Sequence, residues 1–359
     1  MIDKVHTRCS RVAPIVFASL LTLFGCKHGA IGPDEGGSYP SGRRDYLWKV
    51  DTLQIDPFQY LQGLWGTSPN DVWAVGTAGI WHFDGTSWSQ VGHFSGLNLS
   101  TIFGISRSDA WIGTSPGGTI YRYNGSQWNT FGDYHLQGFS LCYINSIWGS
   151  SSTNVYAVGC VGNPNTSGRG TILKFDGTTW SYMRIPNISV SFNKIVKATN
   201  ESGNYYLWGE EVLYDTTTNP VTILGFVEKA YEYDGSTSVR EIFSSTAETR
   251  IPYEAGGKVY FTSGGHSVWK WTNNSFVEWY YNSDYSMGLT FGRSENDLFF
   301  WSGYQGSFSP LILAHYNGSD ISPLYKARAF WGCTVFNNDV FIIIDGDVRG
   351  IARGTLGSH

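Results

Sequence analysis

A phrase that repeats along the chain constrains its fold more than any other feature. Residues 64–76 read Leu-Trp-Gly-Thr-Ser-Pro-Asn-Asp-Val-Trp-Ala-Val-Gly, and Ile-Trp-His-Phe-Asp-Gly-Thr-Ser-Trp follows at 80–88. The same phrase returns at 147–159 and 172–180, and more loosely elsewhere. A period of roughly 40 residues built from four short apolar runs indicates a radial array of sheets, because one such unit is too small to bury its own hydrophobic face.

The number of repeats can be counted from the turn residue that opens the second apolar run of each unit. β-Branched and aromatic residues follow it, and a run of this composition between turns is typical of a β-strand. Dipeptides such as Asp84-Gly85 and Asn124-Gly125 supply the positive φ angles of tight hairpins. Four such strands make one blade, so the sequence predicts an all-β, seven-bladed β-propeller. The seven turn residues are Asp71, Asp109, Asn154, Asn204, Lys258, Asp297 and Asp339.

The last unit lacks a fourth strand of its own. After Asp339 the sequence supplies one more strand near 348–352. Leu47–Val50 is similar to a fourth-strand segment, yet no first, second or third strand precedes it. We therefore predict that this N-terminal strand completes the last blade and closes the ring, which removes exposed sheet edges. A propeller uses its length as one ring, so we expect a single domain over 46–359.

The N-terminus has the pattern of a secretory signal. Lys4, Arg8 and Arg11 precede an apolar run of 13 residues, Val12 to Phe24. A bilayer-spanning helix needs about 20 apolar residues, so this run is too short to span a membrane. Basic residues before a short apolar core predict a signal peptide.

The end of that run predicts a lipid anchor. Residues 23–26 read Leu-Phe-Gly-Cys, which resembles a bacterial lipobox. We expect residues 1–25 to be a lipoprotein signal peptide, Cys26 to be lipidated, and the Gly-, Pro- and Ser-rich residues 26–45 to form a flexible tether. The alternative is an ordinary signal peptide that happens to contain a cysteine.

Location and charge narrow the range of partners. A lipidated Cys26 would attach the protein to a membrane of the bacterial cell envelope, and we favour the outer membrane or cell surface over the cytoplasmic membrane. Removal of residues 1–25, which hold three basic residues and one acidic residue, changes the net charge from −5 to −7. This acidic balance argues against nucleic acid as a partner. We expect a monomer.

Two of the remaining cysteines are candidates for a disulfide. Cys142 begins the first strand of the third unit and Cys160 ends the second, so folding that hairpin is expected to place them opposite one another. A disulfide there suits an oxidising compartment and would stabilise the fold by roughly 3 kcal/mol. Two free buried thiols are the alternative.

The sequence offers little catalytic chemistry. Gly113 to Gly117 reads Gly-Thr-Ser-Pro-Gly, but the G-x-S-x-G nucleophile motif functions on a turn between a strand and a helix, and here it falls in a plain strand connection. No Cys/His spacing indicates zinc, and no glycine-rich nucleotide motif is present. We therefore expect no catalytic residues, no metal and no cofactor.

The repeated unit, W-G-S-S-x-x-D-V-W-A-V-G followed by Y-D-G-x-x-W, resembles the repeats of bacterial secreted β-propellers. It is kelch-like in placing an aromatic residue and a turn before a fourth-strand tryptophan. The resemblance covers 46–359, is clearest in the first three units, and implies a surface lipoprotein with this fold. Eight tryptophans recur at equivalent places and are expected to pack between blades: Trp65, Trp73, Trp88, Trp111, Trp128, Trp148, Trp180 and Trp331.

Loop lengths point to one face of the ring as the binding surface. Second-to-third-strand loops and connections between blades share a face, and the longer insertions, at 161–169, 210–228 and 304–310, belong to it. Aromatic residues of these loops that lie outside the repeat pattern are candidate ligand contacts, although the loops could instead pack on each other. They are Tyr134, His135, Tyr214, Phe226, Tyr280, Tyr281, Tyr285, Tyr304 and Phe308.

These features favour a non-catalytic, lipid-anchored binding module for a protein or glycan ligand. One alternative is a glycoside hydrolase or lyase that acts on polysaccharide through acids of the same face, such as Glu210, Glu211 or Asp284. A second alternative is a structural component of an envelope complex.

Overall fold

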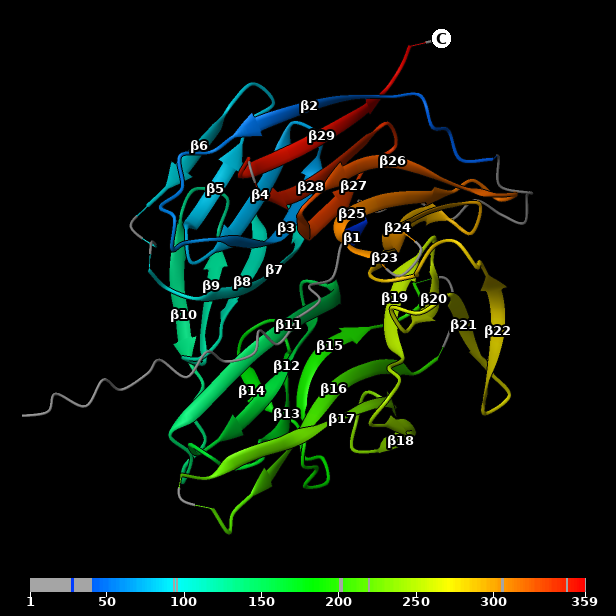
Figure 1. Ribbon diagram of the computed structural model, residues 1–359. Coiled ribbons are helices and arrows are strands. Elements are labelled where there is room, and N and C mark those ends of the chain that lie inside the picture. The colour runs from blue at the N-terminus through cyan, green and yellow to red at the C-terminus, as the bar shows by residue number, and fades with distance from the viewer. Residues whose placement is uncertain are drawn as a thin grey trace, which may run out of the picture.

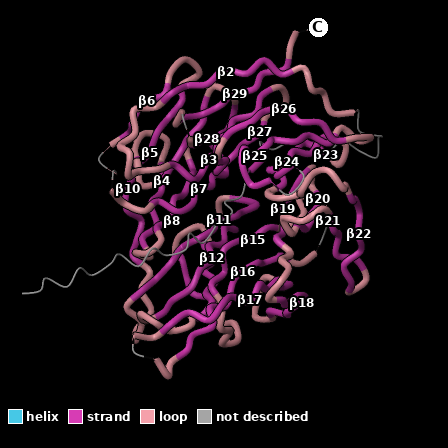
Figure 2. The backbone as a smooth tube through the Cα atoms, viewed as in Figure 1, coloured by secondary structure: helices cyan, strands magenta, loops and turns pink. Residues whose placement is uncertain are grey.

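The computed structural model describes residues 27–28, 41–92, 94, 96–199, 203–218, 220–304, 307–346 and 348–358. Every regular element in these ranges is a β-strand (Figure 2), and the strands form seven antiparallel sheets arranged around a ring (Figure 1). The predicted all-β, seven-bladed β-propeller is confirmed. Cys26 and residues 1–25, to which the signal-peptide prediction applies, lie outside the described residues, as does most of the expected tether.

Blades one to six each consist of four strands in chain order, with the first strand nearest the centre of the ring (Figure 1). The seventh blade takes its fourth strand from the N-terminal part of the chain. Blade one contains β3 (Leu61–Ser68), β4 (Asp71–Gly76), β5 (Gly79–Phe83) and β6 (Trp88–Val91), and blade two contains β7 (Leu99–Ser106), β8 (Asp109–Thr114), β9 (Thr119–Tyr123) and β10 (Trp128–Asp133). Blade three contains β11 (Leu141–Ser151), β12 (Asn154–Gly162), β13 (Arg169–Phe175) and β14 (Trp180–Tyr182), and blade four contains β15 (Ser191–Val196), β16 (Tyr205–Asp215), β17 (Thr222–Tyr233) and β18 (Val239–Ser245). Blade five contains β19 (Ile251–Ala255), β20 (Lys258–Thr262), β21 (Ser267–Thr272) and β22 (Ser275–Tyr281), and blade six contains β23 (Thr290–Ser294), β24 (Asp297–Tyr304), β25 (Ser307–Tyr316) and β26 (Ile321–Ala327). Blade seven contains β27 (Ala329–Val335), β28 (Asp339–Asp345), β29 (Gly350–Leu356) and β2 (Tyr46–Thr52).

The ring is closed by the N-terminal strand, as the sequence predicts. β2 pairs antiparallel with β29 in an unbroken ladder that runs from Tyr46 opposite Leu356 to Thr52 opposite Gly350. The last sheet therefore joins strands from both ends of the chain, and its outer edge lies at β2 instead of β29. A two-residue strand, β1 (Lys27–His28), pairs parallel with the inner strand β27 of the same sheet.

The turn residues that count the blades also hold the blades together. The second strand begins at the predicted turn residue in six blades, and one residue later in the fourth. In the first blade the Asp71 carboxylate lies 2.8 Å from Nε2 of His82 on the third strand. The His82 ring in turn stacks on Trp73 of the second strand, with ring centroids 4.0 Å apart. An acid, a base and an aromatic ring thus bind the second and third strands of the blade to one another.

The same arrangement recurs in three other blades, with arginine as the base in two of them and histidine in the third. Asp109 accepts a hydrogen bond of 2.9 Å from Nε of Arg122, whose guanidinium lies over the Trp111 ring. In the sixth and seventh blades the pairs are Asp297 with His315, at 2.7 Å, and Asp339 with Arg353, at 2.9 Å. The Asp-x-aromatic part of the repeated phrase is therefore explained by blade construction and needs no ligand.

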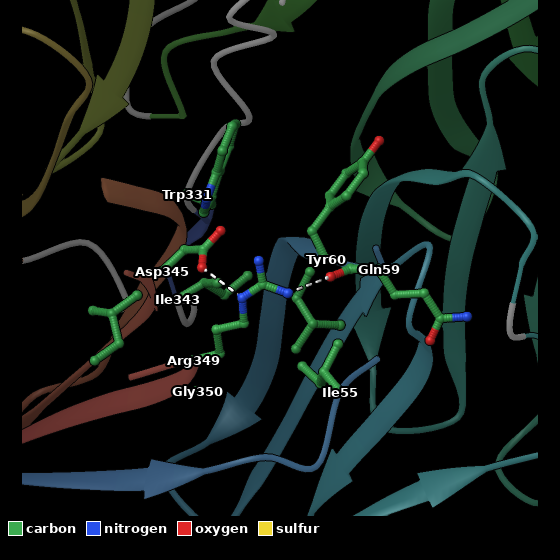
Figure 3. Close-up of a pocket in the computed structure, with 10 residues that line it drawn as sticks. Ile55, Gln59, Tyr60, Trp331, Ile343, Asp345, Arg349 and Gly350 are labelled. Carbon is green, nitrogen blue, oxygen red and sulfur yellow. Dashed lines mark hydrogen bonds and ion pairs between the residues drawn. The ribbon is translucent and has the colours of Figure 1, made fainter. Parts of the chain in front are cut away.

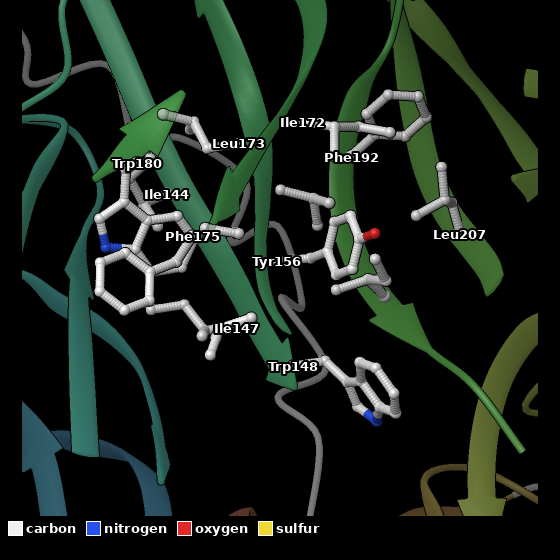
Figure 4. Close-up of a cluster of buried hydrophobic side chains, with 14 of the residues drawn as sticks. Ile144, Ile147, Trp148, Tyr156, Ile172, Leu173, Phe175, Trp180, Phe192 and Leu207 are labelled. Atoms are coloured by element: carbon white, nitrogen blue, oxygen red, sulfur yellow. The ribbon is translucent and has the colours of Figure 1, made fainter. Parts of the chain in front are cut away.

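The recurring tryptophans pack between blades. Six of the eight are buried, while Trp88 and Trp331 are half-buried. A Cβ at Gly104 would lie 2.3 Å from the Trp65 ring, so glycine is required there for the first blade to insert that ring against the second. Figure 4 shows the cluster of buried side chains centred on the third blade, in which Trp148, Tyr156 and Trp180 take part.

The predicted disulfide between Cys142 and Cys160 is wrong, because both thiols are free and buried. Cys142 lies opposite Val161 and Cys160 lies opposite Tyr143, so the cysteines are offset by one residue in the ladder. A one-residue offset places two side chains on opposite faces of a sheet.

The expected loop at 210–228 is instead a β-ribbon. β16 and β17 continue past the rest of their blade, and Glu211 to Asp215 pair with Thr222 to Val227. Ser167 Oγ of the third blade donates to the Val212 carbonyl at 2.8 Å and so holds the ribbon toward that blade. Across the part of the chain that the structure describes, no helix is long and apolar enough to cross a bilayer.

Candidate functional site

One face of the ring collects the exposed apolar side chains. We call the side formed by the second-to-third-strand loops and the connections between blades the elaborated face. Ten large hydrophobic side chains are exposed among the described residues, and eight belong to this side, whereas Leu47 and Val277 lie on outer strands. The eight are Phe58, Tyr60, Leu97, Leu213, Ile223, Leu224, Tyr281 and Val348. Because most of the exposed apolar side chains belong to this side, it is the candidate interaction surface.

A pocket opens on this face at the seam between the last and the first blade, and we call it the seam pocket. It is a shallow hollow, partly open to solvent, with room for about one water molecule. Ile343 of β28 and Ile55 of the connection before β3 form its apolar walls, and Trp331 and Tyr60 lie across from one another (Figure 3). The two rings are close to parallel, at 29°, with centroids 6.4 Å apart.

Arg349 holds the two sides of the seam pocket together. Its Nε lies 2.9 Å from the Asp345 carboxylate of the last blade. Its Nη1 donates to the Pro57 carbonyl at 2.8 Å and to the more distant carbonyls of Asp56 and Gln59. Figure 3 shows the guanidinium between Asp345 and the chain at Gln59. Phe58, 93% exposed, sits in the connection that Arg349 holds.

A belt of polar side chains surrounds the centre of the ring near the same face. The first strands of blades one to four each contain a β-bulge near their beginning, and the bulged residue is polar and buried in every case. We call these four residues the polar belt; they are Gln62, Ser100, Asn145 and Asn193.

The polar belt connects each blade to the next. Gln62 Nε2 donates to the Leu99 carbonyl at 2.9 Å, Ser100 Oγ donates to the Ile144 carbonyl, and Asn145 Nδ2 donates to the Phe192 carbonyl at 3.0 Å. Each acceptor is the residue just before the bulge of the following blade. These bonds satisfy carbonyls that the bulges leave unpaired, so the polar belt links the first strands of neighbouring blades.

At the fourth blade the hydrogen bond of the polar belt goes to a residue of the same blade. Asn193 Nδ2 donates to Glu210 of its own blade at 3.0 Å and not to the fifth blade. Glu210 lies directly opposite Glu228 on the neighbouring strand, and Trp208 Nε1 donates to Glu228 at 2.7 Å. Burial raises the pKa of Glu210 to about 8, and the charge of Glu228 and its hydrogen bond to Glu210 act in the same direction. At neutral pH the two carboxyl groups therefore share a proton.

A buried lysine occupies the seam between the fourth and fifth blades. Lys194 is 2% exposed, and its Nζ lies 3.8 Å from the centroid of the Tyr253 ring of the fifth blade. Among the described residues Nζ has no hydrogen-bond partner. Burial lowers the pKa of Lys194 well below its ordinary value. At the corresponding register position blades one to three have small residues, Gly63, Thr101 and Ser146.

The predicted aromatic contacts are divided among several environments. Tyr134 and Tyr285 are half-buried against the hydrophobic clusters of their blades, and Tyr280 packs on Tyr316 with centroids 4.7 Å apart, so these side chains contribute to packing. His135 and Tyr281 are exposed. Tyr214 and Phe226 lie on the two strands of the ribbon, opposite Ile223 and Val212. Tyr304 and Phe308 lie in β24 and β25, and their side chains are outside the description.

The candidate acids do not form an opposed pair. Glu211 is bound to Lys229 Nζ at 2.9 Å, and Asp284 lies exposed in the connection after β22. Glu210 faces Glu228 on an adjacent strand. Ser115 donates its hydroxyl to Asn145 Oδ1 at 2.8 Å, which is an amide oxygen and not a base able to activate a nucleophile. The described residues contain no group of three or more His, Cys, Asp or Glu side chains placed to hold a metal ion.

Sequence reasoning missed the seam pocket. Phe58 and Tyr60 lie in a connection of unremarkable length, and Trp331 belongs to the repeat. Their proximity arises only from ring closure, which brings residues near 55 and 345 together. The predicted ring closure was the signal that could have found the pocket, because closure places the connection after the N-terminal strand beside the loops of the last blade.

Comparisons with known proteins support the fold. No protein-family model matches the chain, and no curated protein does. A solved structure of YCF48 bound to D1 peptide is similar, with 14% identity, a TM-score of 0.57, and coverage of 89% of this chain and 100% of that one. The β-propeller domain of Cps50 (Swd1) from Myceliophteria thermophila has 6% identity, a TM-score of 0.56 and coverage of 86% and 100%. The extracellular domain of the putative hybrid two-component system BT3049 from B. thetaiotaomicron has 15% identity, a TM-score of 0.56 and coverage of 87% of this chain and 42% of that one.

Proposed function

We propose that this protein is a non-catalytic binding module of the bacterial cell envelope that holds a protein partner against its elaborated face. The observation that carries the proposal is the concentration of exposed apolar side chains on that face, with Phe58 and Leu224 exposed by 93% and 68%. Exposing such side chains costs solubility unless a partner covers them, and the rest of the described surface largely avoids them.

The chemistry of these side chains favours a protein over a glycan. Leu213, Ile223, Leu224 and Val348 are aliphatic, and aliphatic side chains offer no flat face on which a sugar ring can stack. Aromatic and aliphatic anchors within a polar rim are typical of the centre of a protein interface. The similar structure of YCF48 holds a peptide, which supports the view that a propeller of this size can serve such a role.

The proposed location rests on the N-terminal pattern. A lipid on Cys26 and the tether after it would hold the propeller at a membrane surface while leaving the ring free to turn toward a partner. The similar BT3049 domain is extracellular, in keeping with this location. We propose a monomer, since one copy carries the complete ring.

An enzyme that acts on polysaccharide is the second candidate, favoured by the raised pKa of Glu210. Glycosidases place their two carboxyl groups about 5 Å or more apart, on either side of the bond to be cleaved. Glu210 and Glu228 share a hydrogen bond, which leaves no room for a sugar between them. We therefore give this pair a structural role.

Co-purification from the envelope of the native host tests the proposal. Full-length protein with Phe58→Ser, or with Ile223→Ser and Leu224→Ser together, should lose the partner that the wild type retains. Leu47→Ser is the matched control, because Leu47 is exposed and apolar but lies on the edge strand β2. Retention of the partner by both surface variants, or its loss in the control, would contradict the proposal. Binding to an immobilised glycan instead of a protein would favour the glycan alternative.

A further inference from the structure

The ribbon of the fourth blade has one edge that no other strand covers. β18 pairs with β17 only between Glu228 and Tyr233, so residues 222–227 run past the outer strand of the blade (Figure 1). The same residues pair with β16 on one side, and among the described residues no strand pairs with their other side. Every second residue of a strand directs its main-chain N–H and C=O groups to that other side. We call this side of 222–227 the open edge.

The opposite edge of the ribbon, that of β16, is held against the third blade. The Ser167 hydroxyl of that blade donates to the Val212 carbonyl at 2.8 Å. Burial raises the pKa of the Tyr214 hydroxyl, and Cys160 of the third blade raises it further, so this side chain also lies near that blade. The edge of β16 is therefore partly occupied, whereas the open edge belongs to β17.

The open edge lacks the features that protect the other sheet edges of the molecule. Natural sheets prevent unwanted strand pairing with charged side chains, prolines or very short edge strands. Of the seven outer strands that the structure describes, five contain a charged residue or a proline, and the other two, β6 and β14, have four and three residues. Residues 222–227 read Thr-Ile-Leu-Gly-Phe-Val, with neither a charge nor a proline. This edge therefore stays able to accept a strand.

A bulge adds an exposed apolar side chain to the ribbon. Leu213 pairs with Gly225 and Tyr214 pairs with Ile223, so Leu224 has no partner in β16. Leu224 is 68% exposed and Ile223 is 50% exposed. The bulge thus presents an apolar side chain to solvent. A strand that adds to the open edge would make main-chain hydrogen bonds and apolar contacts together.

The charge of the ribbon indicates which kind of strand fits it. Residues 210–229 contain four acidic residues and one basic residue, Lys229, which is itself bound to Glu211. Asp215 lies near the tip of the ribbon, opposite Thr222. A second copy of this chain would bring two acidic ribbons together, and like charges on paired strands are unfavourable. A segment with a basic residue near the tip gains attraction instead of repulsion.

We propose that the open edge is the site at which an extended segment of the protein partner adds as a further strand. The main chain of the segment pairs with residues 222–227, its apolar side chains contact Ile223 and Leu224, and a lysine or arginine lies near Asp215. This inference rests on the proposed function, and it names the part of the elaborated face that recognises the partner and the conformation in which the partner is bound.

Photo-crosslinking in living cells of the native host locates the segment. A photo-crosslinking amino acid at Ile223 of the full-length protein should give one discrete product, and mass spectrometry of its tryptic peptides should identify a segment of another protein. Val277 is the matched control, because it is apolar and also 50% exposed but lies next to Glu278 on the outer strand β22. The same amino acid at Val277 should give no discrete product.

The cross-linked segment, synthesised as a fluorescein-labelled peptide, tests the mode of binding to the full-length protein by fluorescence anisotropy. N-methylation of one peptide residue at a time removes one main-chain donor. Only every second residue of an added strand donates to its neighbour. The affinity should therefore fall by about tenfold at alternate positions and stay within about twofold of the unmodified peptide at the positions between them.

A charge on the open edge should weaken binding of the same peptide. Leu224→Lys gives this edge the protection that other outer strands carry and repels the basic residue of the segment, so the affinity should fall by about tenfold. Leu47→Lys is the matched control, because Leu47 is 73% exposed on the outer strand β2, and it should leave the affinity within about twofold of the wild type. Thermal denaturation of both variants separates loss of the edge from loss of the fold.

Any of four results would overturn the inference: no product at Ile223, a product that joins two copies of this chain, an N-methyl series without alternation, or undiminished binding by Leu224→Lys. None of them refutes the proposed function, because a partner can still be held at Phe58, which the co-purification experiment tests separately. Loss of the partner in the Leu47→Ser control, by contrast, would contradict the proposed function and leave the peptide result untouched.

Discussion

Replacement of Glu210 by Gln should remove a defined part of the pH dependence of folding. A glutamate in the unfolded chain titrates at its ordinary pKa of 4.5, whereas burial and Glu228 raise the pKa of Glu210 to about 8 in the folded protein. Between these values the native state holds a proton that the unfolded state has released. The free energy of unfolding therefore falls as the pH rises through this window.

The size of the effect follows from the two pKa values. Each pH unit inside the window changes the free energy of unfolding by about 1.4 kcal/mol. The wild type is thus expected to lose at most about 3 kcal/mol between pH 5.5 and 7.5 through this carboxyl group. Glutamine keeps an oxygen for Asn193 Nδ2 and can donate to Glu228, so the variant should match the wild type near pH 5 and exceed it at pH 7.5.

Urea denaturation followed by tryptophan fluorescence at pH 5.5, 6.5 and 7.5 measures this difference. Glu211→Gln is the matched control, because Glu211 is the next residue on the same strand but faces Lys229. A difference between Glu210→Gln and the wild type that stays constant with pH would refute the reasoning. A loss of stability in the variant at pH 7.5 would refute it as well.

Four further predictions concern the fold and its anchor. Lys194→Met should raise the free energy of unfolding by about 1–3 kcal/mol at neutral pH. It should also reduce the rise of that free energy with pH, because the lysine binds a proton in the unfolded state that the buried amine does not bind. Urea denaturation measures both effects, and destabilisation would contradict the prediction. Tyr46→Ala should lower the free energy of unfolding by about 3–4 kcal/mol, whereas Leu47→Ala, on the exposed side of β2, should lower it by less than about 0.5 kcal/mol. Equal losses in the two variants would contradict ring closure. Asp297→Asn should lower the free energy of unfolding by about 3 kcal/mol, because it removes the carboxylate charge that compensates the buried Arg293 guanidinium; a change within error in urea denaturation would contradict that role. Mass spectrometry of Cys26 should show a thioether-linked lipid, and a peptide joining Cys26 to Cys333 by a disulfide would contradict lipidation.

The fold was predictable because the same short sequence pattern recurs in the blades. Turn residues such as Asp71 and Asp339 start the second strands where expected, because the Asp carboxylate accepts a bond from a base one strand away. The segment Leu47–Val50 was recognisable as a fourth strand because it resembles the segment Trp88–Val91. These signals are local, so a single sequence suffices to locate them.

The candidate site was less predictable because its parts meet only in three dimensions. The offset of Cys142 from Cys160 depends on the bulge at Asn145, which shifts the ladder by one residue and which no sequence signal marked. The sequence analysis predicted a loop at the β-ribbon, because its apolar residues are compatible with either a loop or a strand. Arg349 and Phe58 are almost 300 residues apart in sequence, and only the closed ring brings them together.

The central claim is that the elaborated face is the one that holds a protein. A photo-crosslinking amino acid placed at Phe58 in the full-length protein, in living cells of the native host, should give one discrete cross-linked protein. The same amino acid at Ser126, exposed in a turn on the opposite face, should give none. A discrete product from Ser126 with none from Phe58 would contradict the account.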